Sequence, residues 1–132
     1  MLLKKEELPV VPKDEMNEIH YEEVDIINDL YNCAINENLE KTKEYLEEFI
    51  NHIEDHFSFE EELMEQNEFF AYPIHKMEHD NVLSRIYNIK KQFEETNDTK
   101  VIAKFLENEF VPWLINHLNT MDMATASFLG GF

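Results

Sequence analysis

The sequence predicts an all-α protein, an up-and-down antiparallel four-helix bundle with a short N-terminal arm. The 132 residues include only 2 glycines and 4 prolines, too few for a β protein with many turns. Hydrophobic residues make up 43% of the chain, enough for the core of one domain. Apolar residues also recur in alternating steps of three and four along four long stretches, which is typical of amphipathic helices.

The arm is expected over residues 1–13, where Pro9 and Pro12 favour an extended chain, and the bundle over residues 14–132. The helices are expected over about residues 14–36 (starting between 14 and 17), 40–65, 72–93, and 100–117 or a little beyond. Their inner stripes are, in order, His20, Val24, Ile27, Tyr31 and Ala34; Tyr45, Phe49, His52, His56, Glu60 and Leu63; His75, His79, Val82, Ile86, Ile89 and Phe93; and Ala103, Leu106, Phe110, Trp113 and His117.

Prolines and polar residues mark the later boundaries. Pro73 suits the first turn of the third helix, and residues 94–99 are expected to form a polar loop. Pro112 cannot donate to the carbonyl of Asn108, so a kink is expected there, with a break into two helices as the less favoured alternative.

The formal charge of −18 argues against binding to nucleic acid or to anionic membranes. No stretch has the length of a membrane span or the pattern of a signal peptide, so the expected compartment is the cytoplasm. Export of a folded chain after removal of a signal is the alternative. The single cysteine, Cys33, excludes an intramolecular disulfide and is expected to act as a small apolar filler.

Histidines gather at one end of the predicted bundle. In this topology the start of the first helix, the end of the second, the start of the third and the end of the fourth meet. These positions hold His20, His56, His75, His79 and His117. Several unpaired polar groups in a core would cost several kcal/mol, and a bound metal cation would offset that cost. The pattern therefore predicts a metal site.

Carboxylates complete the predicted donor set. Two pairs of candidates have the i, i+4 spacing that places side chains on one helical face, namely His56 with Glu60 and His75 with His79. Asp122 follows His117 by five residues, about 140° away on a regular helix. Both can face one site only if the chain forms a π-type turn there or leaves the helix.

These motifs resemble those of bacterial hemerythrins and the hemerythrin-like family. The resemblance covers residues from about 16 to 122, and Trp113 also fits it. It implies two non-haem iron ions, one held by His75, His79 and His117 and the other by His20 and His56. Glu60 and Asp122 would bridge them together with an oxide or hydroxide, which leaves one position open for dioxygen.

The implied function is reversible oxygen binding for storage, delivery or sensing, without enzymatic turnover. A donor set rich in histidine stabilises high oxidation states less than a carboxylate-rich set, which agrees with this expectation. Phe59, Trp113 and Leu118 are expected to form an apolar wall that keeps water out. No attached signalling domain is expected from the sequence, so sensing would require an unknown protein partner. A monomer is the favoured oligomeric state.

Glu23 departs from the family pattern, in which leucine is common one turn after the first histidine. The carboxylate is expected either to reach solvent or a hydrogen-bonding neighbour, or to approach the second iron and cover its open position. The latter would favour redox chemistry on peroxide or nitric oxide, or iron handling. The tryptophan-containing N-terminal arm common in the family is also absent. His52, one turn before His56, is expected to be a buried supporting group.

The segment from His75 to His79 also matches the His-x-x-Glu-His motif of some zinc peptidases. That interpretation leaves the other histidines unexplained. Glu78, which would be its general base, is instead expected to point away from the site.

Overall fold

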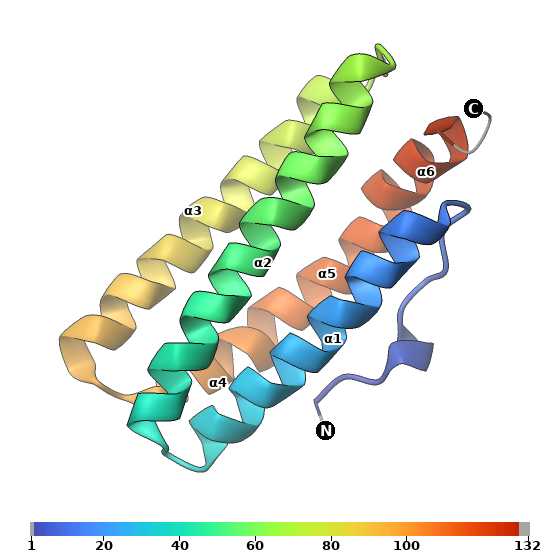
Figure 1. Ribbon diagram of the computed structural model, residues 1–132. Coiled ribbons are helices and arrows are strands. Elements are labelled where there is room, and N and C mark those ends of the chain that lie inside the picture. The colour runs from blue at the N-terminus through green and yellow to red at the C-terminus, as the bar shows by residue number, and fades with distance from the viewer. Residues whose placement is uncertain (1, 130–132) are drawn as a thin grey trace.

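The computed structural model describes residues 2–129 and confirms an all-α four-helix bundle (Figure 1). Residue 1 of the predicted arm and residues 130–132 of the predicted bundle lie outside the described range. The elements are a 3₁₀ turn η1 (Lys5–Glu7), α1 (Asp14–Ile35), α2 (Leu39–Gln66), α3 (Tyr72–Thr96), α4 (Thr99–Phe105), the π turn η2 (Leu106–Phe110), α5 (Val111–His117), the π turn η3 (Leu118–Asp122) and α6 (Met123–Leu129).

Short connections set neighbouring helices antiparallel, as Figure 1 shows. Asn38 caps α2 by accepting a hydrogen bond from the Lys41 amide, and Asp98 caps α4 through the Lys100 amide. Asn97 has a φ of 53°, the left-handed conformation that ends α3. The loop expected over residues 94–99 is therefore too long, because α3 continues to Thr96 and α4 starts at Thr99.

The fourth helix is one continuous rod built from α4, η2, α5, η3 and α6 (Figure 1). Two backbone bonds span five residues instead of four: Val111 N–H donates to the Leu106 carbonyl, and Met123 N–H to the Leu118 carbonyl. The backbone keeps helical dihedral angles on both sides of Pro112, so the alternative of a break is wrong. The helix also extends to Leu129, well beyond the predicted end.

The N-terminal arm is docked along α1. The Asn28 amide accepts from Leu3 N–H at 3.0 Å and donates to the Leu3 carbonyl at 2.8 Å. Asn17 pairs in the same way with Val11, at 2.9 and 2.7 Å. Leu3 and Val11 are buried. Two asparagines three turns apart on α1 thus hold the arm by its backbone.

Apolar side chains fill the bundle from its middle to the end that carries the α1–α2 and α3–α4 connections. Phe49 and Phe110 meet edge to face there, with ring centroids 5.0 Å apart. The opposite end contains buried polar residues instead. Within residues 2–129, none of the helices combines the length and apolar character of a membrane span.

Candidate metal centre

The structure brings all seven predicted site residues together at one end of the bundle, and all seven are buried. They come from the first third of α1, the second half of α2, the start of α3, the end of α5 and the end of η3. In that order they are His20; His56 and Glu60; His75 and His79; His117; and Asp122.

Their donor atoms form two overlapping groups, and within each group the atoms lie within 4.8 Å of one another. The first group contains Glu60, His75, His79, His117 and Asp122; the second contains His20, His56, Glu60 and Asp122. The first offers three nitrogens and two carboxylates, and the second two nitrogens and the same two carboxylates.

Glu60 faces both groups through different oxygens. Its Oε2 lies 2.6 Å from His56 Nε2 and 3.7 Å from His20 Nε2. Its Oε1 lies 3.2 Å from His79 Nε2 and 3.5 Å from His75 Nε2. One carboxylate is thus placed to contact two metal ions, one through each oxygen.

Asp122 likewise turns one carboxylate oxygen toward each donor group. Its Oδ2 lies 3.0 Å from His20 Nε2, and its Oδ1 lies 3.0 Å from both His75 Nε2 and His117 Nε2. The π turn η3 makes this possible, because its wider turn places Asp122 on the same face as His117 five residues earlier. The sequence predicted either a π-type turn or an exit from the helix at this point, and the structure confirms the π-type turn.

The geometry fits bound cations better than a network of hydrogen bonds. Several buried atoms have no hydrogen-bond partner among the described residues despite their mutual proximity: His20 Nε2, His79 Nε2, Glu60 Oε1 and both carboxylate oxygens of Asp122. His75 Nε2 and His117 Nε2 also lie only 3.1 Å apart. Cations placed among these lone pairs would satisfy them together, so the residues suit a pair of metal ions.

Three histidines of the first group are held through their outer nitrogens. His75 Nδ1 lies 2.7 Å from Thr125 Oγ1, His79 Nδ1 lies 2.9 Å from Glu61, and His117 Nδ1 lies 2.5 Å from Glu78. A carboxylate can only accept, so its partner Nδ1 carries a proton, and Nε2 is the nitrogen left to bind a metal. Glu78, which was expected to point away from the site, lies outside both donor groups, but its side chain crosses from α3 to the outer nitrogen of the histidine on α5.

Glu23 lies on the outer side of His56, in contact with His56 Nδ1. Nε2 of His56 faces the donor groups, so the whole imidazole separates this carboxylate from them. Of the two expectations for Glu23, contact with a neighbour is confirmed and approach to the open metal position is wrong. The same oxygen lies 3.5 Å from Nδ1 of His52, the supporting group expected on α2.

Aromatic rings cover the first group. Phe57 stacks on His79 with centroids 3.9 Å apart, and Trp113 stacks on His117 at 4.4 Å. Leu118 is buried in the same apolar cluster as these two rings. Phe59, expected in this wall, is half-buried and packs instead in a separate small cluster with Val11, Met16, Ala126 and Met123.

The buried charges shift one another's protonation. Burial lowers the pKa of His20, but its contacts with Asp122 and Glu60 outweigh burial and raise the pKa to about 9. His75 follows the same pattern, with a pKa of about 9. Burial and Glu60 would raise the pKa of Asp122, but His117, His20 and His75 hold it well below its ordinary value.

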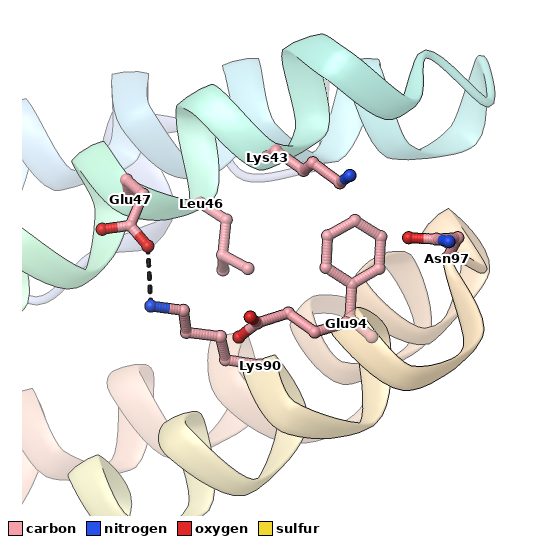
Figure 2. A pocket seen from close by; sticks show the side chains of 7 residues that line it. Lys43, Leu46, Glu47, Lys90, Glu94 and Asn97 are labelled. Carbon is pink, nitrogen blue, oxygen red and sulfur yellow. Dashed lines mark ion pairs between the residues drawn. The ribbon is translucent and has the colours of Figure 1, made fainter.

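Two surface hollows lie at different distances from the metal centre. Figure 2 shows one between α2 and α3, where Lys90 pairs with Glu47 at 2.7 Å. Leu46 in its lining precedes His56 by ten residues, roughly 15 Å along the helix, so this hollow lies far from the donor groups. Another hollow, of about 310 Å³, reaches a site residue; it is lined by Ile19, Glu22, His52, Asp55, His56 and Phe59.

Sequence reasoning missed the partners of the outer nitrogens, Glu61 and Thr125, and the stacked ring of Phe57. Glu61 directly follows Glu60, and Phe57 directly follows His56, but neighbours on a helix point in different directions. Thr125 lies beyond the predicted end of the fourth helix. The one feature of the sequence that could have indicated Thr125 is its position three residues after Asp122, because this spacing places two side chains on the same face of a helix.

Comparison with known proteins agrees with the geometry. Residues 11–128 match the family described as "Hemerythrin HHE cation binding domain". The chain is 37% identical to the bacteriohemerythrin of Aquifex aeolicus over 98% of this chain and 99% of that protein. It is 26% identical to the bacteriohemerythrin of Stenotrophomonas maltophilia, over 86% of this chain and 72% of that one. With a matching bundle, seven converging donors and these relatives, the chain belongs to the hemerythrin family.

Proposed function

We propose that this protein holds two non-haem iron ions and binds dioxygen reversibly, for storage, delivery or sensing. The observation that carries the proposal is the pair of donor groups sharing both carboxylates, each of which turns one oxygen toward each group. Mixed nitrogen and oxygen donors suit iron. When bound, the iron pair would supply the electrons and the coordination position that dioxygen binding requires.

The donor count assigns different tasks to the two positions. His75, His79 and His117 would hold one ion, and His20 and His56 the other, with Glu60 and Asp122 contacting both. With one nitrogen fewer, the second ion is the one we assign to dioxygen. An oxide or hydroxide bridge is part of the proposal.

The protein's own residues would protect this chemistry. Glu61 and Glu78 accept the Nδ1 protons of His79 and His117, which leaves the Nε2 atoms to bind a metal, and Thr125 orients His75. Phe57 and Trp113 cover two of the imidazoles. Exclusion of water from one side of the centre slows proton entry, which supports reversible binding over loss of reduced oxygen.

A second candidate function is redox chemistry on peroxide or nitric oxide. It is favoured by the carboxylates of Glu23, Glu61 and Glu78 on outer imidazole nitrogens, because negative charge there makes a ligand more basic and stabilises an oxidised metal. This candidate does not require Glu23 at the open position.

The deciding experiment is iron loading of the metal-free protein without oxygen, followed by metal analysis and absorption spectra on exposure to oxygen. Oxygen carriage predicts two irons per chain and a visible band that appears with oxygen and disappears on its removal. Direct passage to a stable oxidised form with steady peroxide consumption would support the second candidate. Failure to take up two irons would reject both.

A further inference from the structure

The histidines of the two donor groups differ in the contacts that their outward Nδ1 atoms make. In the first group, all three histidines have a partner on Nδ1. In the second group, neither His20 Nδ1 nor His56 Nδ1 forms a hydrogen bond within residues 2–129, but His56 Nδ1 makes an ion-pair contact with Glu23, whereas the ion pairs of His20 involve Nε2. His56 is therefore the one histidine of this group with a charged neighbour on its outer nitrogen, and that neighbour is Glu23.

Glu23 is itself held in place from the protein surface. Its side chain is 0% exposed, and its Oε2 contacts His56 Nδ1 and lies 3.5 Å from His52 Nδ1. His52 is 18% exposed, and its Nε2 lies 3.2 Å from a carboxylate oxygen of Glu22. Glu22, at 68% exposure, faces solvent. A continuous row of contacts thus runs from solvent to the imidazole of His56.

Burial of a carboxylate is costly unless it gains strong contacts. A leucine at this position would fill the same arc of α1 at lower cost, so the charge of Glu23 needs a compensating interaction. The contact that the geometry offers is with His56, whose Nδ1 meets Glu23 and whose Nε2 lies 2.6 Å from Glu60 Oε2. A carboxylate can only accept, so a metal ion bound at Nε2 would take the place of a proton there, and Nδ1 would keep its proton toward Glu23.

We propose that Glu23, held by His52, is the positioning residue of the second metal position and sets how tightly that ion is bound. It acts through His56 by fixing the orientation of the ring and the nitrogen that carries the proton. The second position has fewer donors and only this charged support, so it depends on Glu23 more than the first position depends on any single outer partner. This inference rests on the proposed two-metal function.

The test is a calorimetric titration of the metal-free protein with Co²⁺ without oxygen, on the wild-type chain and on Glu23→Gln. Glutamine keeps the shape and removes the charge. The wild type should bind two ions, the tighter one at the five-donor group. Loss of an outer partner lowers metal affinity about 10- to 100-fold, so Glu23→Gln should weaken the second ion by that factor and leave the first within about twofold.

Two further variants make the assignment specific. Glu78→Gln is the matched control, because Glu78 holds His117 of the first group in the same way. It should weaken the tighter ion and not the second. His52→Gln keeps the carboxylate of Glu23 but removes the imidazole that contacts it, so the affinity for the second ion should fall by a smaller factor. In each variant, the absorption spectrum of bound Co²⁺ should differ from that of the wild type only for the binding step whose affinity falls.

Unchanged affinity for both ions in Glu23→Gln, with two ions bound by the wild type, would overturn this inference alone. Equal weakening of both ions would also overturn it, because that is the result of a merely structural role. If Glu23→Gln fails to fold by circular dichroism, His52→Gln decides: no selective loss at the second ion rejects the inference. A wild-type chain that binds fewer than two ions rejects the proposed function and this inference together.

Discussion

Each histidine of the centre uses its ring nitrogens for different tasks. In all five, Nε2 faces the shared carboxylates, whereas Nδ1 faces outward. The outward contact determines which tautomer is present, and hence whether the inward nitrogen can bind a metal. Thr125 and Glu78 are therefore as much a part of the donor geometry as the imidazoles that they contact.

At this scale we predict a steep pH dependence of metal binding. In the metal-free protein the pKa values of His20 and His75 are raised to about 9, so both must lose a proton to bind a metal near neutral pH. Affinity for Co²⁺ should rise at least about tenfold per pH unit between roughly pH 6.5 and 9. Titrations at three pH values within that range measure it, and a flat profile would contradict it.

The same raised pKa values have the opposite effect on the metal-free fold. The native state holds protons that the unfolded chain releases near pH 6.5, so the stabilising contribution of His20 and His75 is complete below about 6.5. It is lost as the pH rises through about 9. Denaturant unfolding of the metal-free protein should therefore show declining stability over the range in which metal binding strengthens.

At the scale of elements, the docked arm is held chiefly by side chains of α1. Asn17 and Asn28 each offer an amide that satisfies both the N–H and the carbonyl of one arm residue. Val11 then packs in the small cluster that includes Met123, the neighbour of Asp122. The arm therefore closes the bundle next to the metal centre.

We predict that Asn28→Ala lowers the free energy of unfolding by about 1–3 kcal/mol, because it leaves the buried amide of Leu3 without its acceptor. Urea unfolding measures this loss, and hydrogen exchange should show faster exchange at Leu3. Asn88→Ala, at an exposed position within α3, is the matched control and should change stability by less than about 0.5 kcal/mol. Equal effects of the two substitutions would show that the arm contacts contribute nothing.

The sequence predicted the bundle and the convergence of the seven candidates because both follow from local spacing: apolar stripes and i, i+4 pairs. It did not predict that Glu78 reaches His117, because that contact joins residues 39 apart and depends on side-chain direction. The sequence also did not predict that the fourth helix continues far beyond His117. The extra residue of the π turn shifts the apolar stripe out of its regular period, so the pattern could not be followed further.

At the scale of the whole molecule, charge and metal binding are linked. The chain has a formal charge of −18, and part of this negative charge lies on the buried carboxylates of the centre, which repel one another unless cations lie between them. Metal ions bound by the native state and not by the unfolded chain stabilise the fold by mass action. The loaded protein should therefore be much more stable than the metal-free one.

Removal of the metals with a chelator should lower the Tm by roughly 10 °C or more, since each ion contributes about 3 kcal/mol at one hundred times its Kd. Differential scanning calorimetry measures the change. Added salt should recover part of the loss, because it screens the excess of negative charge. A Tm unaffected by the chelator would mean that the ions do not bind the folded centre.

The π turn η3 gives the fourth helix one residue more than a regular α-helical turn needs. If this turn became α-helical without losing a residue, every later side chain would rotate about 100° relative to the preceding part, and Asp122 and Thr125 would turn away from His117 and His75. Deletion of one residue between His117 and Asp122 would instead give these two residues the i, i+4 spacing that His56 and Glu60 already have, and the later side chains would keep their directions. In this family member, therefore, a gap of one residue at this turn is compatible with an unchanged metal centre.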